Sequence, residues 1–512
     1  MEKINKSQKW PIMLFTIGVF MAGLDNGIIS TALTIIYESF GVSPSWGAWS
    51  ITLYTLGIAI SVPIIGKLSD NYGRRRLFLI EIALFGLGSL LVALSPNFVF
   101  LLIARFIQAI GGGGIFIIGS SHILATMPKK KQGKALGLLG AMHGLSAVIG
   151  PNLGAVILKL TGTWQWMFLI NIPIALFLII FGYLKIPETK AQQSKRLDLK
   201  GTALLTLSIL TLMFGITNID SSNMSESLLS ISVYPLLLLS IFLFIWLIKY
   251  EQYLEEIKED PIFSANLLKQ RQFQITLILG LFSGGFLAGI IFIPSYVQQV
   301  LNIPVENAGF WMTPLALASG LGAGLGGYLT DKLGAKLTVT ISGVVGVIGF
   351  LMFPIFVTNG LMFVIASILA GVGLGMMLGA PLNSLIGETA KESQYGSALG
   401  TLSLMRQIGL TLFPTIFAGF ITSSTLKVEP ILFKEYGELA KKIINDNGNE
   451  ATEGFSLLLN NISQLSDTNL QNEMLQTVTR IFKTGYDQMF YTSATLAFFV
   501  MLLGIYLLIK EK

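Results

Sequence analysis

Two charged side chains stand inside long apolar stretches of the sequence, and their depths match. Asp25 lies fourteen residues into the run 11–37, and Arg105 lies seven residues beyond Phe98 in the run 98–126. If the two runs are helices that cross a bilayer in opposite directions, both side chains lie ~10 Å below the same surface. A carboxyl group at that depth must be protonated, paired or facing water. The pair could take up a proton when Arg105 moves away and release it when Arg105 returns; the alternative is a static ion pair joining the two runs.

A further acid, Asp70, lies in a short polar loop that occurs twice. The first copy is Gly66-Lys-Leu-Ser-Asp-Asn-Tyr-Gly-Arg-Arg-Arg76, and the weaker copy, Gly327-Tyr-Leu-Thr-Asp-Lys-Leu-Gly-Ala-Lys336, starts 261 residues later. Glycine permits tight turns, while Asp70 can cap the start of a neighbouring helix and engage Arg74 or Arg75. We expect these contacts to close one side of the molecule; the alternative is that the arginines only fix the loop's side of the membrane. The candidate gating residues here are Gly66, Asp70, Gly73, Arg74, Arg75, Asp331 and Gly334.

The composition indicates what kind of elements position these residues. Of the 512 residues, 53% are hydrophobic and only 12% are charged, which is too little polar surface to cover a soluble globule. The sequence therefore predicts an integral membrane protein. Fourteen apolar runs are long enough to cross a hydrocarbon core of about 30 Å. They lie at 11–37, 46–68, 77–95, 98–126, 134–158, 165–185, 199–218, 230–250, 273–298, 306–330, 337–357, 360–386, 395–422 and 485–509.

The distribution of cations predicts the orientation, because Lys and Arg near span ends are retained in the cytoplasm. With both termini inside, 25 of the 34 Lys and Arg residues lie in cytoplasmic segments, two lie within spans and seven lie outside. The net charge of +6 therefore reports membrane topology, and we expect no nucleic-acid partner. The chain has no cysteine and only two histidines, so no metal site is expected. A P-loop is absent as well, and neither a cofactor nor direct use of ATP is expected.

The duplication divides the chain into two halves. We predict an N-terminal six-helix bundle at 1–185, linkers with two extra spans at 186–272, a C-terminal six-helix bundle at 273–422 and 485–512, and an extracellular insertion at 423–484. At an offset of 263, Pro151 aligns with Pro414 and His143 with Arg406, both of the latter near mid-membrane. Parallel repeats place the transport site at their interface near the midplane. By contrast, Glu81 lies only ~6 Å inside the cytoplasmic edge, so we expect it to snorkel or pair with a loop arginine.

Five stretches, in order along the chain, resemble motifs of the major facilitator superfamily and, more narrowly, of its fourteen-span drug:proton antiporters. They are Leu24-Asp25-Asn26 with Ser30-Thr-Ala-Leu33; Gly66 to Arg76; Arg105-Phe-Ile-Gln108 with Gly111 to Gly114; Gly144-Leu-Ser with Gly150-Pro-Asn-Leu-Gly154; and Trp164-Gln-Trp-Met-Phe with Ile170-Asn-Ile-Pro173. The resemblance implies an all-α membrane protein with the major facilitator fold, two pseudo-symmetric six-helix bundles plus two inserted helices. It also implies proton coupling through Asp25 and Arg105, and a role in exchange for Gly150, Pro151 and Gly154.

The same resemblance marks residues that could contact a substrate. His143 and Asn152 stand where the fifth-helix motif is expected to carry apolar residues, which makes them candidates for substrate specificity. Gln108 lies one helical turn beyond Arg105 and is expected to line the same cavity. The candidate substrate-binding residues are Asn26, Tyr54, Gln108, His143, Asn152 and Arg406.

The expected function is export of amphipathic drug-like compounds in exchange for protons, by alternating access, across a bacterial cytoplasmic membrane. We expect a multi-pass monomer in lipid, with both termini cytoplasmic and no enzymatic activity. One alternative is a dedicated exporter of a single endogenous metabolite, lipid or signalling nucleotide, because Arg105, Arg406 and His143 would suit an anion. Another is a non-transporting receptor that binds a partner through 423–484.

Overall fold

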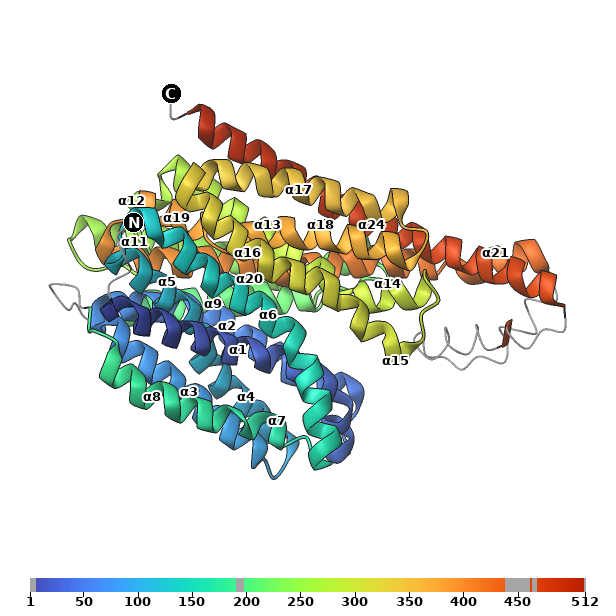
Figure 1. Ribbon diagram of the computed structural model, residues 1–512, viewed down its shortest axis with the longest axis horizontal. Helices are drawn as coiled ribbons and strands as arrows, with labels where there is room; N and C mark the ends of the chain where they lie inside the picture. The colour runs from blue at the N-terminus through green and yellow to red at the C-terminus, as the bar shows by residue number, and fades with distance from the viewer. Residues whose placement is uncertain (1–5, 190–197, 438–460, 463–466, 511–512) are drawn as a thin grey trace.

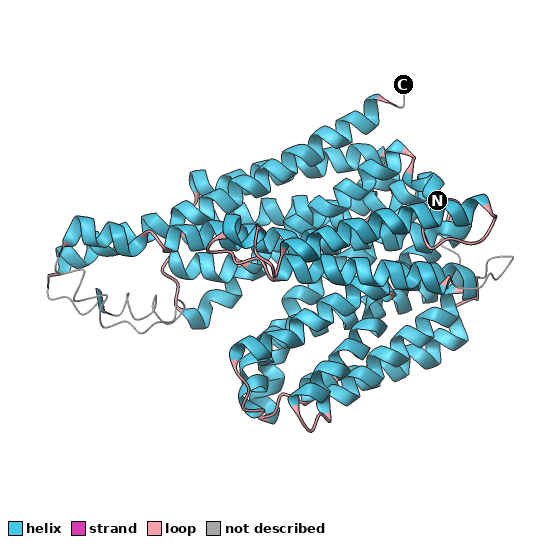
Figure 2. Ribbon diagram, turned by 180° about the vertical axis from the view of Figure 1, so that it is seen from behind, coloured by secondary structure: helices cyan, strands magenta, loops and turns pink. Residues whose placement is uncertain are grey.

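The computed structural model describes residues 6–189, 198–437, 461–462 and 467–510, and helices are the only regular structure in these ranges (Figure 2). The helices lie side by side in an elongated bundle, with both ends of the chain at one end of it (Figure 1). We call this end the terminal end and the other the distal end. The predicted all-α membrane fold is confirmed.

The first half of the chain forms six spans that lie together in Figure 1. Two of the six are interrupted, one by a break at Gly114 and one by a short helical turn before the main helix. The helices are α1 (Lys6–Ser39), α2 (Pro44–Tyr72), α3 (Arg74–Ala93), α4 (Phe98–Gly113) continued by α5 (Ile115–Thr126), α6 (Lys129–Thr161), and α7 (Trp166–Leu169) followed by α8 (Asn171–Lys185).

The second half repeats this arrangement. Its helices are α13 (Arg271–Ile291) continued by α14 (Ile293–Gln299), α15 (Val305–Ala308), the 3-10 turn η1 (Gly309–Met312), α16 (Thr313–Leu333), α17 (Ala335–Phe356), α18 (Gly360–Leu378) continued by α19 (Pro381–Thr389), η2 (Glu392–Gln394), α20 (Tyr395–Thr425), α21 (Val428–Tyr436) and α24 (Thr468–Ile509). Between the halves lie α9 (Leu199–Thr217), α10 (Met224–Leu228), α11 (Tyr234–Glu256) and α12 (Ala265–Leu268).

Local signals that set helix ends recur at the repeat spacing. Asn97 caps α4 by accepting a hydrogen bond from the Phe100 N–H, and Asn359 caps α18 in the same way. Gly73 and Gly334, which separate the helices of each loop copy, have φ angles of 103° and 90°. Side chains other than glycine rarely adopt such angles. The duplication read from the sequence is therefore present in backbone geometry as well.

The number of spans is close to the predicted fourteen. By length and composition, twelve of the described helical segments could cross a membrane, or thirteen if the bent α6 counts as one span. The helix at the remaining predicted run, α16, contains five glycines and is not among these segments. Fourteen spans therefore remain a prediction.

The end of the chain differs from the predicted boundaries. The run 485–509 is the end of a 42-residue helix, α24, that begins at Thr468. Outside the bundle, α24 packs against α21 through Leu432, Met474 and Val478. The rest of the predicted insertion, 438–460 and 463–466, lies outside the described residues.

Glycine pairs bring the two halves into contact at the terminal end. A Cβ atom on Gly66 of α2 would lie 2.2 Å from the carbonyl oxygen of Gly396 in α20. A Cβ atom on Gly327 of α16 would lie 2.4 Å from the carbonyl oxygen of Gly133 in α6. These two seams, α2 with α20 and α6 with α16, join the halves backbone to backbone.

Toward the distal end the seams separate. The α6 helix bends by 43° between Ser146 and Ile149, just before Pro151, whose missing N–H weakens the helix there. Before the bend, Gly144 still approaches Gly320 of α16, whereas after it Gly150 packs on Gly27 of its own half. The halves are thus closed against each other at the terminal end and part beyond the midpoint.

The backbone at Gly73 gives a test of the fold. In Gly73→Ala the new Cβ atom would be held at a positive φ and would lie 2.5 Å from the Glu188 carboxylate. We expect a loss of about 1–3 kcal/mol in the free energy of unfolding, measured by thermal unfolding in detergent. The matched control is Gly324→Ala, which is helical and has no atom within 4 Å of the added Cβ. Equal stability of the two variants would contradict the assigned backbone geometry.

Candidate functional site

Asp25 lies at the centre of a buried polar network in the N-terminal half. Arg105 donates through Nη1 to one Asp25 oxygen, and Gln108 donates through Nε2 to the other at 2.7 Å. The same Arg105 Nη1 also donates to Gln108 Oε1 at 2.6 Å. Gln108 Nε2 and the amide of Asn171 both reach Ser89 Oγ. All five side chains are fully buried, so the predicted proximity of Asp25 and Arg105 is confirmed.

Four elements supply this network, and close packing sets their positions. Asp25 comes from α1, Arg105 and Gln108 from α4, Ser89 from α3 and Asn171 from α8. On α3, a Cβ atom at Gly88 would lie 2.5 Å from the Gln108 Cα. Small residues of this kind let transmembrane helices approach closely enough for side chains to meet across them.

The guanidinium of Arg105 is held but not fully satisfied. It lies over the Tyr54 ring at 4.0 Å from the centroid and near Phe168 at 5.7 Å. Its Nε and Nη2 atoms are buried without hydrogen-bond partners. A buried ion pair of this kind is costly to break by removing one charge, about 3–5 kcal/mol. The charges of Asp25 and Arg105 therefore depend on each other.

The structure separates the predicted substrate-binding residues into two groups. Gln108 was expected to line a cavity and Tyr54 to contact the substrate, whereas in this structure they are 0% and 2% exposed and belong to the Asp25 network. Their part in substrate binding stays a prediction. His143 and Asn152, by contrast, are exposed on α6. The side chain of Asn26 lies outside the described residues.

Arg406 lies across from His143, close enough for their charges to interact. It extends from α20, is half-buried and donates through Nε to Ser283 Oγ at 3.0 Å. Its Nη2 atom is buried without a partner. The two residues related by the sequence repeat thus lie within electrostatic range of each other, from opposite halves.

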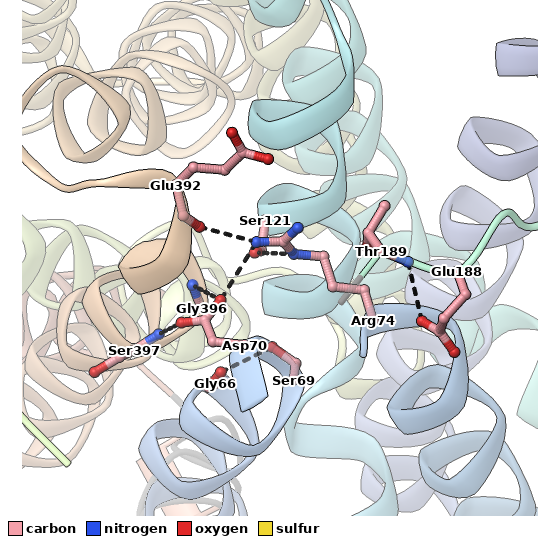
Figure 3. A network of polar contacts seen from close by, with 10 residues as sticks. All are labelled: Gly66, Ser69, Asp70, Arg74, Ser121, Glu188, Thr189, Glu392, Gly396 and Ser397. Carbon is pink, nitrogen blue, oxygen red and sulfur yellow. Dashed lines mark hydrogen bonds and ion pairs between the residues drawn. The ribbon is translucent and has the colours of Figure 1, made fainter. Parts of the chain in front are cut away.

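A first polar cluster closes the α2–α20 seam, and we call it the first latch (Figure 3). The carboxylate of Asp70 accepts hydrogen bonds from the N–H groups of Gly396 and Ser397 at 3.0 and 2.9 Å, at the start of α20. Arg74 pairs with Asp70 at 3.3 Å and donates to the carbonyl oxygen of Glu392 at 3.2 Å. One carboxylate and one guanidinium of the first half thereby hold the helix start of the second half.

A second cluster, the second latch, repeats this contact at the α6–α16 seam. Asp331 accepts from the N–H groups of Gly133 and Lys134 at 2.6 and 2.9 Å, near the start of α6. Ala335 stands where the first copy has Arg74, so this latch has no such arginine. Asp331 is also partly exposed, whereas Asp70 is buried. The second latch likewise pairs one carboxylate with two successive N–H groups of the opposite half, one turn further into the helix and with fewer contacts.

Of two expectations about neighbouring charges, one is confirmed and one is wrong. Asp70 engages Arg74, one of its two expected partners, while Arg75 pairs with Glu188 at 3.7 Å, and Glu188 also accepts from the backbone N–H of Arg75. Glu81 neither snorkels nor pairs with a loop arginine: it is 0% exposed and accepts from the Gly114 N–H at 2.9 Å. The break between α4 and α5 opens a backbone donor that the sequence pattern did not show.

Sequence reasoning also missed residues that complete the site. Ser89 is a single small polar residue in an apolar span, without distinctive spacing. Asn171 stands in the Ile170-Asn-Ile-Pro173 stretch, but the resemblance assigned it no role. Asp260, in the linker after α11, pairs with Lys67 at 2.7 Å and accepts from Asn71 at 3.1 Å beside the first latch. Within the described ranges, no group of three or more His, Asp or Glu residues is placed to hold a metal ion.

Comparisons with known proteins agree with this geometry. A family model described as the Major Facilitator Superfamily matches residues 15–414. The chain is similar to an uncharacterized MFS-type transporter, YfiU, of Bacillus subtilis (strain 168), with 54% identity over 97% of this chain and 96% of the relative. It is also similar to Multidrug resistance protein 3 of the same organism, with 32% identity over 80% of this chain and 79% of the relative.

A solved structure shares the fold. The human organic anion transporter MFSD10 (TETRAN) superposes with a TM-score of 0.57 at 16% identity, covering 92% of this chain and 99% of that chain. At this identity the likeness concerns the helical arrangement alone.

The first latch generates a test that uses the absence of native cysteine. In Asp70→Asn the charge that holds Arg74 and two N–H groups is lost, which we expect to weaken closure at the terminal end by about 2 kcal/mol, or about thirtyfold. The reporter is His143→Cys, labelled by a membrane-impermeant thiol reagent added at the distal side. Its labelling rate should fall as the population shifts away from this state. Asp331→Asn, at the less buried second latch, should have a smaller effect on the labelling rate. An unchanged labelling rate in Asp70→Asn would contradict the role of the first latch in closing the terminal end.

Proposed function

The chain belongs to the major facilitator superfamily, and from this membership we propose that it exports amphipathic drug-like compounds in exchange for protons. The observation that carries the proposal is the buried Asp25, whose two oxygens are both held by Arg105 and Gln108. The likeness to Multidrug resistance protein 3 supports the drug-like class of substrate. As a transporter, the protein is expected to act without a cofactor and to use the proton as its coupling ion.

The Asp25 network supports proton coupling because an unpaired carboxylate at Asp25 would be unstable in these apolar surroundings. Moving Arg105 away from an ionised Asp25 would leave an unpaired carboxylate in an apolar environment. A proton on Asp25 removes that charge and frees Arg105 to move with α4. Rearrangement of the helices is then linked to proton uptake, and the return of Arg105 expels the proton.

The positions of the latches support an assignment of the state. They close the terminal end, which we place in the cytoplasm because 25 of the 34 cations then lie on that side. The state described is therefore outward-facing, in a bacterial cytoplasmic membrane. Alternating access would require both latches to open and the distal parts of α1, α2, α6 and their counterparts to close.

The central residues also favour a second candidate, a dedicated exporter of one anionic metabolite, lipid or signalling nucleotide. Arg406 has a buried Nη2 atom without a partner, and His143 faces it from the other half. A guanidinium with a free donor is suited to carboxylate or phosphate groups. This observation concerns the substrate alone, since proton coupling at Asp25 would serve either class.

Asp25→Asn tests the coupling step. The amide keeps the shape of the side chain but cannot carry the proton or pair with Arg105, so uptake driven by a pH gradient should fall at least tenfold. The measurement is accumulation of an ethidium-like dye in proteoliposomes with an imposed gradient. Asp487→Asn is the matched control, because Asp487 pairs with Lys483 one helical turn away on α24, apart from the network. Gradient-driven uptake equal to that of the unmodified protein would refute the proposal.

Arg406→Gln separates the two substrate classes. If the substrate is anionic, loss of the guanidinium should weaken transport by about tenfold or more, since charge-assisted hydrogen bonds contribute about 1.5–3 kcal/mol. If it is a cationic or neutral drug, transport should be retained or increased. The measurement is a panel of cationic dyes and organic anions on everted vesicles. Loss of cationic dye transport with unchanged anion transport would contradict both assignments of Arg406.

A further inference from the structure

A second carboxyl group lies fully buried in the N-terminal half, apart from Asp25. Glu81 on α3 is 0% exposed. Its Oε2 atom accepts from the N–H of Gly114, and its Oε1 atom is buried with no hydrogen-bond partner. An ionised carboxylate is thus half satisfied here, which is a costly way to keep a charge inside a membrane protein.

No cation compensates Glu81 within the described residues. The helices packed against α3 are α2, α4, α5, α7 and α8. None of their titratable or charged side chains hydrogen-bonds or pairs with Glu81. These side chains are Tyr54, Lys67, Asp70 and Tyr72 on α2, Arg105 on α4, His122 on α5, and Tyr183 and Lys185 on α8.

The glycines at the end of α4 connect Glu81 to the Asp25 network. Where a Cβ atom would stand on Gly112, Gly113 and Gly114, the neighbouring atoms include Tyr54 Oη at 3.2 Å, Ser61 Oγ at 2.1 Å and Glu81 Oε2 at 2.6 Å. Three successive glycines therefore let three polar groups from α2 and α3 pack closely around the end of α4. We call Tyr54, Ser61 and Glu81 the polar row.

Along the chain of α4 and α5, the glycines that contact the polar row lie between the two sites already described. Tyr54 stacks on Arg105 at one end. From Arg105 to Gly114 is nine residues, or ~14 Å, and from Gly114 to Ser121, which accepts from Arg74 in the first latch, is seven residues, or ~10 Å. Glu81 thus lies between the Asp25 network and the terminal end.

We propose that Glu81 is a second proton-binding site of the transport cycle, reached from Asp25 along Tyr54 and Ser61. In this step a proton leaves the Asp25 carboxyl group and binds Glu81 at its unpartnered Oε1, and it later leaves toward the first latch. Only a proton is transferred, and no other bond changes. The inference rests on the proposed proton coupling, and it gives the proton an intermediate position on its way to the terminal side.

The competing explanation is that Glu81 is a permanent cap for the N-terminus of α5. The Gly114 N–H is a donor freed by the helix break, and an acidic side chain is favoured at such an end. Glu81→Gln separates the two, because the amide oxygen can still accept from Gly114 whereas the side chain can no longer release a proton.

The experiment uses the full chain in proteoliposomes with an ethidium-like dye. For Glu81→Gln we expect dye counterflow, which needs no net proton movement, to stay within twofold of the unmodified protein. Uptake driven by a pH gradient should fall at least tenfold. Glu251→Gln is the matched control, since Glu251 is a buried carboxylate, 1% exposed, on the inserted α11.

Infrared difference spectroscopy can measure protonation of the Glu81 carboxyl group directly. In Asp25→Asn protein, a carbonyl band of a protonated carboxylic acid should titrate with pH and disappear when Glu81→Gln is added. If Glu81→Gln does not fold, Glu81→Asp keeps a titratable group and should shift the band. An unchanged band together with normal gradient-driven uptake would overturn the inference and leave the helix cap.

The two proposals fail in different ways. If the unmodified protein ignores the pH gradient, proton-coupled export is wrong whatever Glu81 does. If the unmodified protein responds and Glu81→Gln responds equally, coupling stands and the second site is wrong.

Discussion

A charge inside an apolar bundle must be matched by a partner, and the site is built around this constraint. Asp25 is buried with Arg105 and Gln108 as its partners, and removing either charge of the ion pair would leave the other unpaired in an apolar environment. Their positions in turn depend on α3 lying against α4, which Gly88 permits at Gln108 and Gly111 permits at Phe85. Because glycine leaves no side chain between these helices, a shift of α4 relative to α3 would change the distance between Arg105 and Asp25. The interactions of the Asp25 carboxyl group therefore depend on how the helices of the N-terminal half pack.

The latches apply the same constraint at the terminal end. Asp70 and Asp331 each accept two backbone N–H groups from a helix of the opposite half. The two groups at Asp70 lie in the first turn of α20, where N–H groups have no partner within their own helix, so Asp70 satisfies them and meets the positive end of that helix. When the halves separate, the backbone donors and the carboxylate lose each other as partners, and both must then form hydrogen bonds with water. The end that carries the latches can open only where water can reach it.

The sequence was informative where a residue type conflicts with its surroundings. Asp25 and Arg105 in apolar runs, the repeated loop with Asp70, and Pro151 just after the bend of α6 each break a simple pattern, and Asp25 and Asp70 have the arginine partners expected of them. Ser89, Asn171 and Glu81 could not be assigned in the same way, because their partners come from other helices and from a backbone break at Gly114. Tyr54 and Gln108, named as substrate-binding candidates, are buried in the Asp25 network. Helical spacing gives the direction of a side chain but not whether a neighbouring helix covers it.

The inserted helices add an asymmetry that the duplication alone would not produce. The α9 helix packs through Ile209 over Ile60 of α2 and Leu404 of α20, and so covers the α2–α20 seam. The linker after α11 then bridges the same seam, since Asp260 pairs with Lys67 of α2 while the Ile262 carbonyl oxygen accepts from Ser397 Oγ of α20. The α6–α16 seam has the second latch and its glycine contacts but neither of these additions. Opening at the terminal end must therefore break more polar contacts at α2–α20 than at α6–α16, and the pseudo-symmetric halves need not separate equally at both seams.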